Sequence, residues 1–170
     1  SEVFLKGDEL DKAEKSILKA CRLSKEYNLI DIYGKCSSLL GDINVKRNSL
    51  TDAVSYYEKA LHYFIKDTDA RSMFRCYINI GKIHLKEKLY KIAVKFKLAN
   101  DVIEDMEFEK HKEDYKELYS GMAYCHMKLG DNDVCMDYIE KIDEITKRYD
   151  SKQELESNIL KANNLFSLGR

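Results

Sequence analysis

The strongest constraint on this chain is a pair of residue patterns that recur about every 40 residues. One pattern places apolar or small residues at steps of three and four, and its best copy is Leu50, Ala53, Tyr57 and Ala60. The other is a large apolar residue followed by a small one: Leu40-Gly41, Ile80-Gly81, Met122-Ala123 and, more weakly, Lys161-Ala162. Because both patterns keep nearly the same period, the chain is predicted to consist of repeated structural units.

The remaining copies of the first pattern confirm the phase between the two markers. They are Leu10, Ala13, Ile17 and Ala20; Tyr90, Ala93, Phe96 and Ala99, with the last two members one residue early; and Asn132, Cys135, Ile139 and Ile142. Each small residue of the second pattern falls twelve positions before the next anchor, as Gly41 does before Ala53. This fixed offset indicates two helices per unit that pack closely at the small residues.

Composition supports helices throughout, because the chain has no Pro and only seven Gly to interrupt them. We find no convincing run of alternating residues that would predict a strand. The first helix of each unit is predicted at 30–46, 71–87, 111–128 and 152–168, and the second at 9–26, 49–66, 89–106 and 132–148. Polar turn residues support these boundaries: Asn48-Ser49 with Asp52, Asp67-Thr68-Asp69, and Gly130-Asp131 with Asp133.

These positions resemble the tetratricopeptide repeat, in which a Leu-Gly pair precedes an anchor Ala and an aromatic residue. The best copy runs from Leu40-Gly41 to Ala60. The resemblance implies an all-α, right-handed solenoid of antiparallel helix-turn-helix repeats. The unit here is longer than the usual length of about 34 residues and lacks the usual Pro. It is similar in this to the extended repeats of kinesin light chains and of Gram-positive peptide-pheromone receptors.

The repeat phase predicts one array over 1–170, with a partial repeat at 1–28, full repeats at 29–68, 69–109 and 110–150, and a partial repeat at 151–170. Both ends divide a repeat and remain apolar, at Phe4 and Leu5 and at Leu165 and Phe166. Solenoids usually end in units with a polar outer face. We therefore expect a fragment of a longer protein, whose open ends are covered by missing chain or by self-association.

The residue types predict neither catalysis, nor a cofactor, nor a metal. The four His form no pair at ligand spacing, and Cys125-His126 point in different directions on a helix. Cys36 and Cys76 occupy equivalent places before Gly41 and Gly81, so buried structural thiols are expected. A formal net charge of −1 does not indicate a basic surface that would bind nucleic acid. No apolar run is long enough to span a membrane. Five irregularly spaced Cys favour reduced thiols and a cytoplasmic location.

The resemblance implies that outward positions of the first helices line a concave groove that binds a partner. The groove residues we predict are Lys35, Ser38, Asp42, Lys46, Arg75, Asn79, Lys82, Lys86, Glu117, Tyr124 and Lys128. Further outward positions are Val45, Ile78, Leu85, Ser120 and Met127, with Glu156, Ile159, Asn163 and Phe166 in the last helix.

Two features of this groove indicate its ligand. Asn79 resembles the amide with which many family members hold the backbone of an extended ligand. The family's carboxylate clamp for chaperone tails is matched at this one position of five, so no such binding is expected. Because several of the other groove residues are basic, an acidic or mixed peptide is favoured.

Two functions follow from the resemblance. One is a non-catalytic scaffold or adaptor whose groove binds a peptide or helix of a partner protein. The alternative is a peptide-sensing regulatory domain of a pheromone-receptor-type regulator, in which a secreted peptide enters the same groove. An output domain elsewhere in the full protein would favour the alternative. Nucleic-acid binding would need a continuous basic stripe, which the repeated Asp and Glu oppose.

Overall fold

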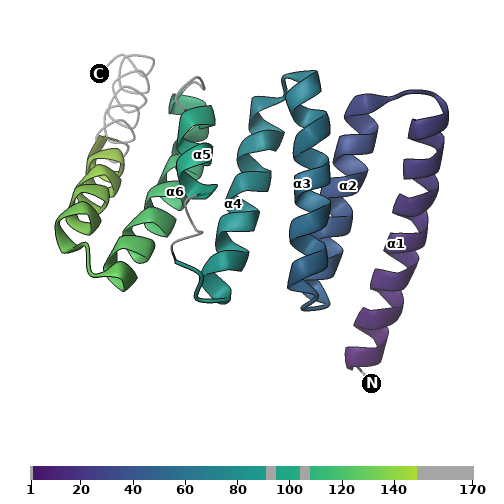
Figure 1. Cartoon of the computed structure of the whole chain (residues 1–170), viewed down its shortest axis with the longest axis horizontal. Coiled ribbons are helices and arrows are strands. Elements are labelled where there is room, and N and C mark those ends of the chain that lie inside the picture. The colour runs from purple at the N-terminus through teal and green to yellow at the C-terminus, as the bar shows by residue number, and fades with distance from the viewer. Residues whose placement is uncertain (1, 91–94, 104–107, 149–170) are drawn as a thin grey trace, which may run out of the picture. The chain divides into compact units, whose positions relative to one another are not determined.

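A computed structural model describes residues 2–90, 95–103 and 108–148 of the 170-residue chain, and all the regular structure in these ranges is helical (Figure 1). The chain divides into two compact units, residues 1–107 and 108–170, which are described separately. The prediction of an all-helical fold is confirmed for the described part of the chain.

The described residues of the first unit form five helices, each packed against the next in sequence order (Figure 1). They are α1 (Glu2–Glu26), α2 (Ile30–Lys46), α3 (Leu50–Asp67), α4 (Ala70–Lys86) and α5 (Lys95–Ile103). The boundaries of α2 are those predicted, and α3 and α4 differ by one residue at each end. Helix α1 begins seven residues before the predicted start. The predicted start of the next helix at Leu89 is wrong, because Leu89 and Tyr90 lie in the turn after α4.

The second unit contains α6 (Phe108–Leu129) and a helix over residues 132–148. The latter begins at its predicted start and continues to the last described residue, and α6 is a few residues longer than predicted. Helix α6 is kinked at His111, where φ is −126° and ψ is 17°. The predicted helix at 152–168 lies outside the described residues.

The same backbone turn ends five of the helices. Residues Asn28, Asn48, Thr68, Lys88 and Gly130 have a positive φ between 55° and 86°. In each case the N–H of the following residue bonds the carbonyl five residues earlier, as from Ser49 to Asn44 at 2.9 Å. This is the Schellman arrangement, which satisfies the last carbonyl groups of a helix. The first four turns fall 20 residues apart, so each helix and its turn make one half of the 40-residue period.

The residues that precede α3 and α4 differ in whether their side chains cap the helix. Asp69 accepts a hydrogen bond from the backbone N–H of Ser72 at 3.0 Å and therefore caps α4, as its sequence context predicted. Ser49 stands at the N-cap position of α3, but its hydroxyl group donates to Asp52 Oδ2 at 2.6 Å and makes no capping bond. The turn before α3 is therefore held by backbone bonds.

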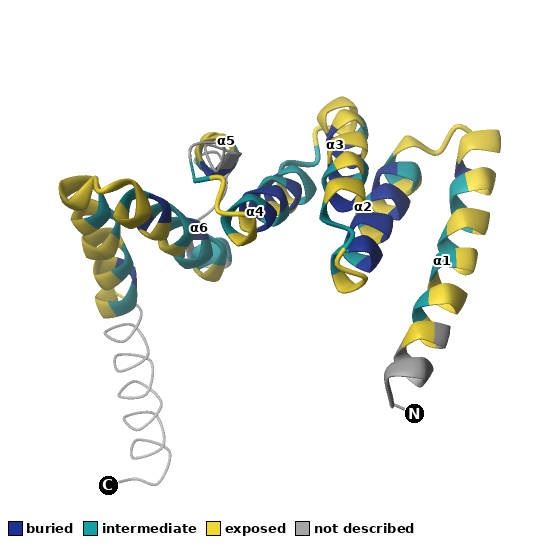
Figure 2. Ribbon diagram, turned by 60° about the horizontal axis from the view of Figure 1, so that its bottom comes forward, coloured by how far each residue is buried: buried dark blue, intermediate teal, exposed yellow. Residues whose placement is uncertain are grey.

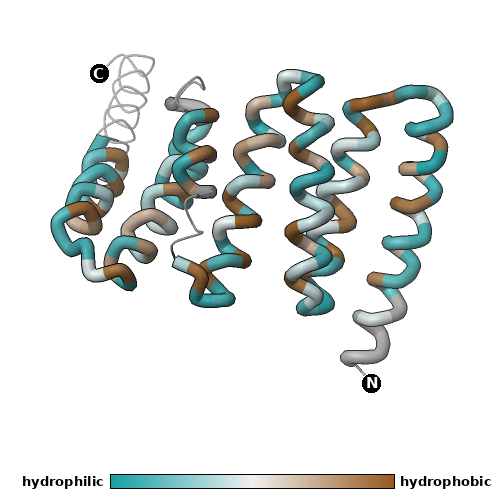
Figure 3. Tube along the Cα trace, viewed as in Figure 1, coloured by the Kyte–Doolittle hydropathy of each residue, from teal (hydrophilic) through white to brown (hydrophobic). Residues whose placement is uncertain are grey.

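The core of the first unit includes the small and aromatic residues that define the repeat in α3. Ala53 and Ala60 are completely buried, and Tyr57 and Phe64 nearly so. Buried residues lie on the sides of α2, α3 and α4 that face one another, whereas α1 is mostly exposed (Figure 2). Apolar residues recur along each of these helices at helical spacing (Figure 3). Burial of this shared face explains why neighbouring helices stabilise each other.

Gly41 and Gly81 lie where an aromatic ring of the next helix packs directly against the backbone. A Cβ atom at Gly41 would lie 2.7 Å from the ring of Tyr57, and one at Gly81 would lie 2.9 Å from the ring of Phe96. The prediction that the small residue of each pair marks close helix packing is confirmed at both positions. The one-residue offset of Phe96 in the repeat pattern therefore retains the same packing role.

In the second unit, aromatic rings and one cation form a stack. Tyr119 and Tyr138 have ring centroids 5.8 Å apart, and the ammonium group of Lys141 lies 5.4 Å and 5.0 Å from them. The ring of His126 stacks on Tyr138 at 5.8 Å, and its Nδ1 lies 3.2 Å from Asp131 Oδ2. This stack joins α6 to the helix at 132–148.

Candidate functional site

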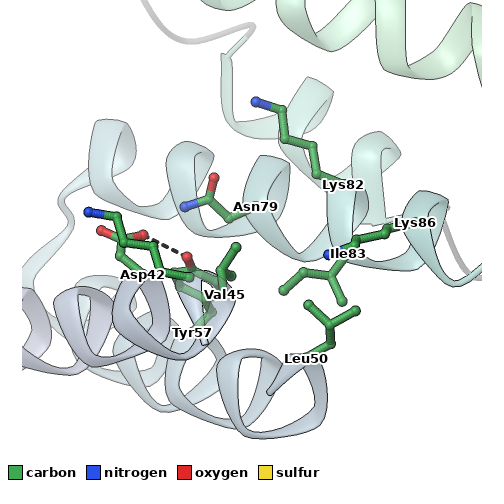
Figure 4. Close-up of a pocket in the computed structure, with 9 residues that line it drawn as sticks. Asp42, Val45, Leu50, Tyr57, Asn79, Lys82, Ile83 and Lys86 are labelled. Carbon is green, nitrogen blue, oxygen red and sulfur yellow. Dashed lines mark hydrogen bonds between the residues drawn. The ribbon is translucent and has the colours of Figure 1, made fainter. Parts of the chain in front are cut away.

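Two adjacent hollows lie between α2 and α4, with α3 contributing to their floor. The first hollow has a volume of about 380 Å³ and is lined by Asp42, Val45, Lys46, Leu50, Tyr57, Asn79, Lys82, Ile83 and Lys86 (Figure 4). The second hollow has a volume of about 430 Å³ and is lined by Lys35, Ser38, Leu39, Asp42, Phe64, Ser72 and Arg75. Asp42 lines both hollows, so they form one trough along the two helices.

A hydrogen-bonded cluster of Asp42, Tyr57 and Asn79 lies where the two hollows meet. The Tyr57 hydroxyl group donates to Asp42 Oδ1 at 2.6 Å (Figure 4). Burial, and then this bond to a carboxylate, raise the pKa of Tyr57 well above its usual range. A hydrogen bond with the Asn79 side chain acts in the opposite direction on the same pKa. Tyr57 is only 1% exposed, so it fixes both polar side chains from below.

Cationic side chains surround this cluster. Lys46, Lys82 and Lys86 line the first hollow and are exposed to solvent. The ammonium group of Lys86 donates to Asn48 Oδ1 at 2.6 Å, which ties α4 to the turn after α2. The second hollow has Lys35, which pairs with Asp31 at 3.5 Å, and the exposed Arg75. With Asp42 as the one carboxylate of the lining, the trough attracts negative charge.

Apolar side chains form part of the lining of each hollow. Val45, Leu50 and Ile83 supply it in the first hollow, and Ile83 is only 4% exposed. In the second hollow, Phe64 is buried and Leu39 is 48% exposed. Each hollow therefore combines an apolar floor with a basic edge.

The structure brings together eight of the predicted groove residues. Lys35, Ser38, Asp42, Lys46, Arg75, Asn79, Lys82 and Lys86 each line one or both hollows. Val45, one of the further outward positions, also lines the first hollow. Ile78 was predicted to point outward, and this is wrong, because it is only 2% exposed. Leu85 is half-buried and lines neither hollow.

The other predicted groove residues belong to the second unit. Tyr124 and Lys128 are exposed on α6, and the Lys128 ammonium group lies 5.2 Å from the centre of the Tyr124 ring. Glu117 is half-buried, and Ser120 and Met127 are exposed. Glu156, Ile159, Asn163 and Phe166 lie outside the described residues.

Sequence reasoning missed the residues that form the floor of the trough. Leu50 and Tyr57 were recognised as repeat anchors of α3 and were therefore assigned to packing alone. Leu39, Phe64 and Ile83 were not singled out. The signal that could have identified Tyr57 is a tyrosine at an anchor position, because a buried hydroxyl group needs a polar partner.

The cysteine side chains have the properties of structural thiols. Cys36 and Cys76 are 5% and 1% exposed, which confirms their predicted burial. Burial raises the pKa of Cys76 to about 12 and that of Cys125 to about 11, so both are protonated at neutral pH. In the part of the chain that the structure describes, no three His, Cys, Asp or Glu residues are grouped so that they could hold a metal ion.

Comparison with known proteins gives no family for the chain. No family model matches it, and no curated protein is significantly similar to it in sequence. Over the described residues, no helix is both long and apolar enough to cross a membrane.

Proposed function

We propose that this chain is a non-catalytic interaction scaffold of the tetratricopeptide-repeat type, a right-handed solenoid that binds a segment of a partner protein. The observation that carries the proposal is the trough between α2 and α4, where eight side chains chosen from the repeat pattern meet over an apolar floor. Repeat proteins typically use such continuous concave surfaces for binding.

The character of the trough supports a peptide ligand that is acidic or mixed in charge. Five cationic side chains and one carboxylate line it, so a negatively charged segment gains favourable contacts on approach. The Asn79 amide can both donate to and accept from a peptide unit. All five cysteines are free thiols, which is typical of a reducing compartment and supports a cytoplasmic location.

Selection of peptides from a random display library on the full chain tests this proposal. Peptides retained by the wild type should be lost when Asn79 and Lys82 are both replaced by Ala, because the amide and one cation of the trough disappear. The matched control is Lys97→Ala, which removes an exposed cation from α5 that lines neither hollow. Circular dichroism should be unchanged in both variants, and the double variant should lose only about 1 kcal/mol of stability, because its one structural loss is the Asn79 bond to Tyr57. Retention of the same peptides by the double variant would refute the trough as the binding surface.

A further inference from the structure

The two cysteines of the first helical hairpin lie at the same level on neighbouring helices. Helix α1 ends at Glu26 and α2 begins at Ile30, and the two helices pack against each other in opposite directions (Figure 1). Cys21 lies five residues before the end of α1, and Cys36 lies six residues after the start of α2. Since each residue rises about 1.5 Å along a helix, the two cysteines are level to within roughly one residue.

The residues one helical turn nearer to the connection show the same alignment. Ser24 and Tyr33 both line a hollow of about 330 Å³ at this end of the hairpin, together with Tyr63 of α3. Ser24 is only 2% exposed, and the rings of Tyr33 and Tyr63 have centroids 4.6 Å apart. Packing between α1, α2 and α3 therefore fixes the register in which the two cysteines face each other.

The thiol groups of Cys21 and Cys36 interact across this hairpin. They share a side-chain hydrogen bond, and both lie near the ring of Tyr33. Closely packed helices have axes about 8–10 Å apart, with Cα atoms about 2.3 Å from each axis. Cα atoms that face each other directly are then roughly 3.5–5.5 Å apart, which overlaps the range of about 4.4–6.8 Å found in disulfide bonds. The two sulfur atoms can therefore be joined without a large backbone movement.

The cysteines of the second unit provide a comparison. Cys125 and Cys135 lie five residues on either side of Gly130, in the turn between α6 and the helix at 132–148. Burial is the cause of the raised pKa of Cys125, without a contribution from Cys135. Similar spacing about a turn therefore does not by itself bring two thiol groups together, and the contact is particular to Cys21 and Cys36.

We propose that Cys21 and Cys36 form a reversible oxidation site, at which a low-molecular-weight disulfide converts the two thiol groups into a disulfide bond between α1 and α2. Both are free thiols in this structure; Cys21 is half-buried, whereas Cys36 is 5% exposed. The reagent therefore reaches Cys21 first. This site is separate from the trough and does not depend on the proposed function.

The exchange proceeds in two steps that conserve atoms and electrons. The Cys21 thiolate attacks one sulfur of the reagent, forms a mixed disulfide and releases one small thiolate. The Cys36 thiolate then attacks the Cys21 sulfur, which forms the bond between the helices and releases the second small thiolate. Two protein thiols are oxidised, one small disulfide is reduced to two thiols, and the two protons from the cysteines pass to those thiols.

Burial makes this exchange slow at neutral pH, so the reduced state persists under ordinary conditions. Burial, and then the interaction with Cys36, raise the pKa of Cys21 to about 11, and the Lys59 ammonium group of α3 acts in the opposite direction. The hydroxyl group of Tyr33 is the other titratable group beside this thiol. Because the thiolate is the nucleophile, the rate of oxidation should rise about tenfold for each pH unit between pH 7 and pH 9.

The disulfide bond should restrain α1, which is mostly exposed and joins the rest of the first unit through α2. The bond closes a loop of about 15 residues, which limits the conformations open to α1 when it detaches. Amide hydrogen exchange over residues 16–26 should therefore be slower by about tenfold or more in the oxidised protein. Exchange over residues 108–148 should be unchanged.

Oxidation of the full chain with oxidised glutathione at pH 8 tests the proposal. The remaining thiols are alkylated in denaturant, and the digested protein is analysed by mass spectrometry. The peptides of Cys21 and Cys36 should be cross-linked, whereas Cys76, Cys125 and Cys135 should be alkylated. Dithiothreitol should restore both thiols and the original exchange rates. Glutathione that stays on Cys21 without a cross-link, or equally rapid cross-links among the other cysteines, would overturn the proposal.

Three variants assign the steps. Cys21→Ser changes a half-buried side chain and should abolish both the cross-link and the slower exchange. Cys36→Ala should stop the reaction at a mixed disulfide on Cys21. The matched control is Cys125→Ala, which removes a buried thiol from the second unit and should leave the cross-link unchanged.

The outcomes remain decisive if the buried Cys36→Ala substitution disturbs the fold, which circular dichroism would show. Cys21→Ser then decides alone, because a cross-link of Cys36 to another cysteine in that variant would contradict the assigned pair. Formation of the bond without slower exchange in α1 would refute its restraining role. All of these results are independent of peptide capture by the trough, so failure of either proposal leaves the other to be judged separately.

Discussion

At the scale of single residues, the packing of α2 against α3 requires a residue without a side chain at Gly41. Its Cα faces the buried ring of Tyr57, which cannot move away without breaking the bond to Asp42. Gly41→Ala should therefore lower the free energy of unfolding by about 1–3 kcal/mol, although alanine is the better helix former. Chemical denaturation measures this change.

Gly7 provides the matched control for this substitution. It also lies within a helix, α1, but a Cβ atom there would meet nothing within 4 Å. Gly7→Ala should be neutral or stabilising by up to about 1 kcal/mol. If Gly41→Ala were as harmless as Gly7→Ala, the close contact between α2 and α3 would not be the reason for glycine at this position.

Tyr57 and Cys76 should make the protein less stable in alkaline solution. Burial raises the pKa of Cys76 from 9.0 to about 12 and raises that of Tyr57 above its ordinary value of 10.0. Above pH 9 the unfolded chain releases protons that the folded chain keeps, so the free energy of unfolding falls as the pH rises. Below pH 9, both groups make their full contribution to the free energy of unfolding. It is lost between pH 9 and 12 for Cys76, and only above pH 10 for Tyr57.

Denaturation of the wild type and of Tyr57→Phe at pH 8 and pH 11 tests this dependence. The variant should be less stable at pH 8 by about 1 kcal/mol, because Asp42 loses a donor. It should then lose less stability than the wild type on going to pH 11, since one titrating group is gone. An identical loss in both proteins would show that Tyr57 does not contribute to the alkaline dependence.

At the scale of helices and turns, residues with a positive φ carry backbone strain when they are not glycine. Thr68 adopts φ 56° although its β-branched side chain strongly disfavours this region. Thr68→Gly should raise the free energy of unfolding by about 1 kcal/mol, because glycine adopts the conformation without strain. The corresponding increase in melting temperature is readily measured by circular dichroism.

Ser55→Gly is the control for this turn substitution. Ser55 is exposed within α3, where glycine should cost several tenths of a kcal/mol through lost helix propensity. The two glycine substitutions should therefore have opposite signs. A loss of stability in Thr68→Gly would mean that the threonine side chain contributes more than its backbone strain costs.

The helices could be predicted from the sequence because two simple signals agree at each of them. Apolar residues at steps of three and four defined α3, and the pairs Leu40-Gly41 and Ile80-Gly81 marked α2 and α4. Polar residues at 48–49 and 67–69 placed the turns between these helices within one residue. The turn before α5 was missed, because Leu89 and Tyr90 resemble the start of an amphipathic helix. Lys88 carries no turn signal in its residue type, although its φ is 60°. The backbone bond from Leu89 to His84 at 2.8 Å fixes this turn instead.

At the scale of the molecule, the repeat period predicted which residues would gather along α2 and α4, but not the floor beneath them. Outward positions were counted from the marker glycines at the helical period, which failed at Ile78, and the resemblance to the tetratricopeptide repeat implied which helices line the groove. The floor depends on how side chains of α3 extend between the other two helices, and a period does not give this. Tyr57 therefore serves both as a packing anchor and as the support of the polar cluster.

The division into two compact units leads to a last prediction about the whole chain. Residues 1–107 and 108–170 form the two compact units. In a chain organised in this way, a local loss of stability spreads mainly to neighbouring helices. Gly41→Ala should therefore accelerate amide hydrogen exchange in α2, α3 and α4 by tenfold or more, which corresponds to about 1.4 kcal/mol. Exchange over residues 108–148 should change much less, as mass spectrometry of the intact chain can show. Equal acceleration in both units would mean that the chain unfolds as one cooperative body.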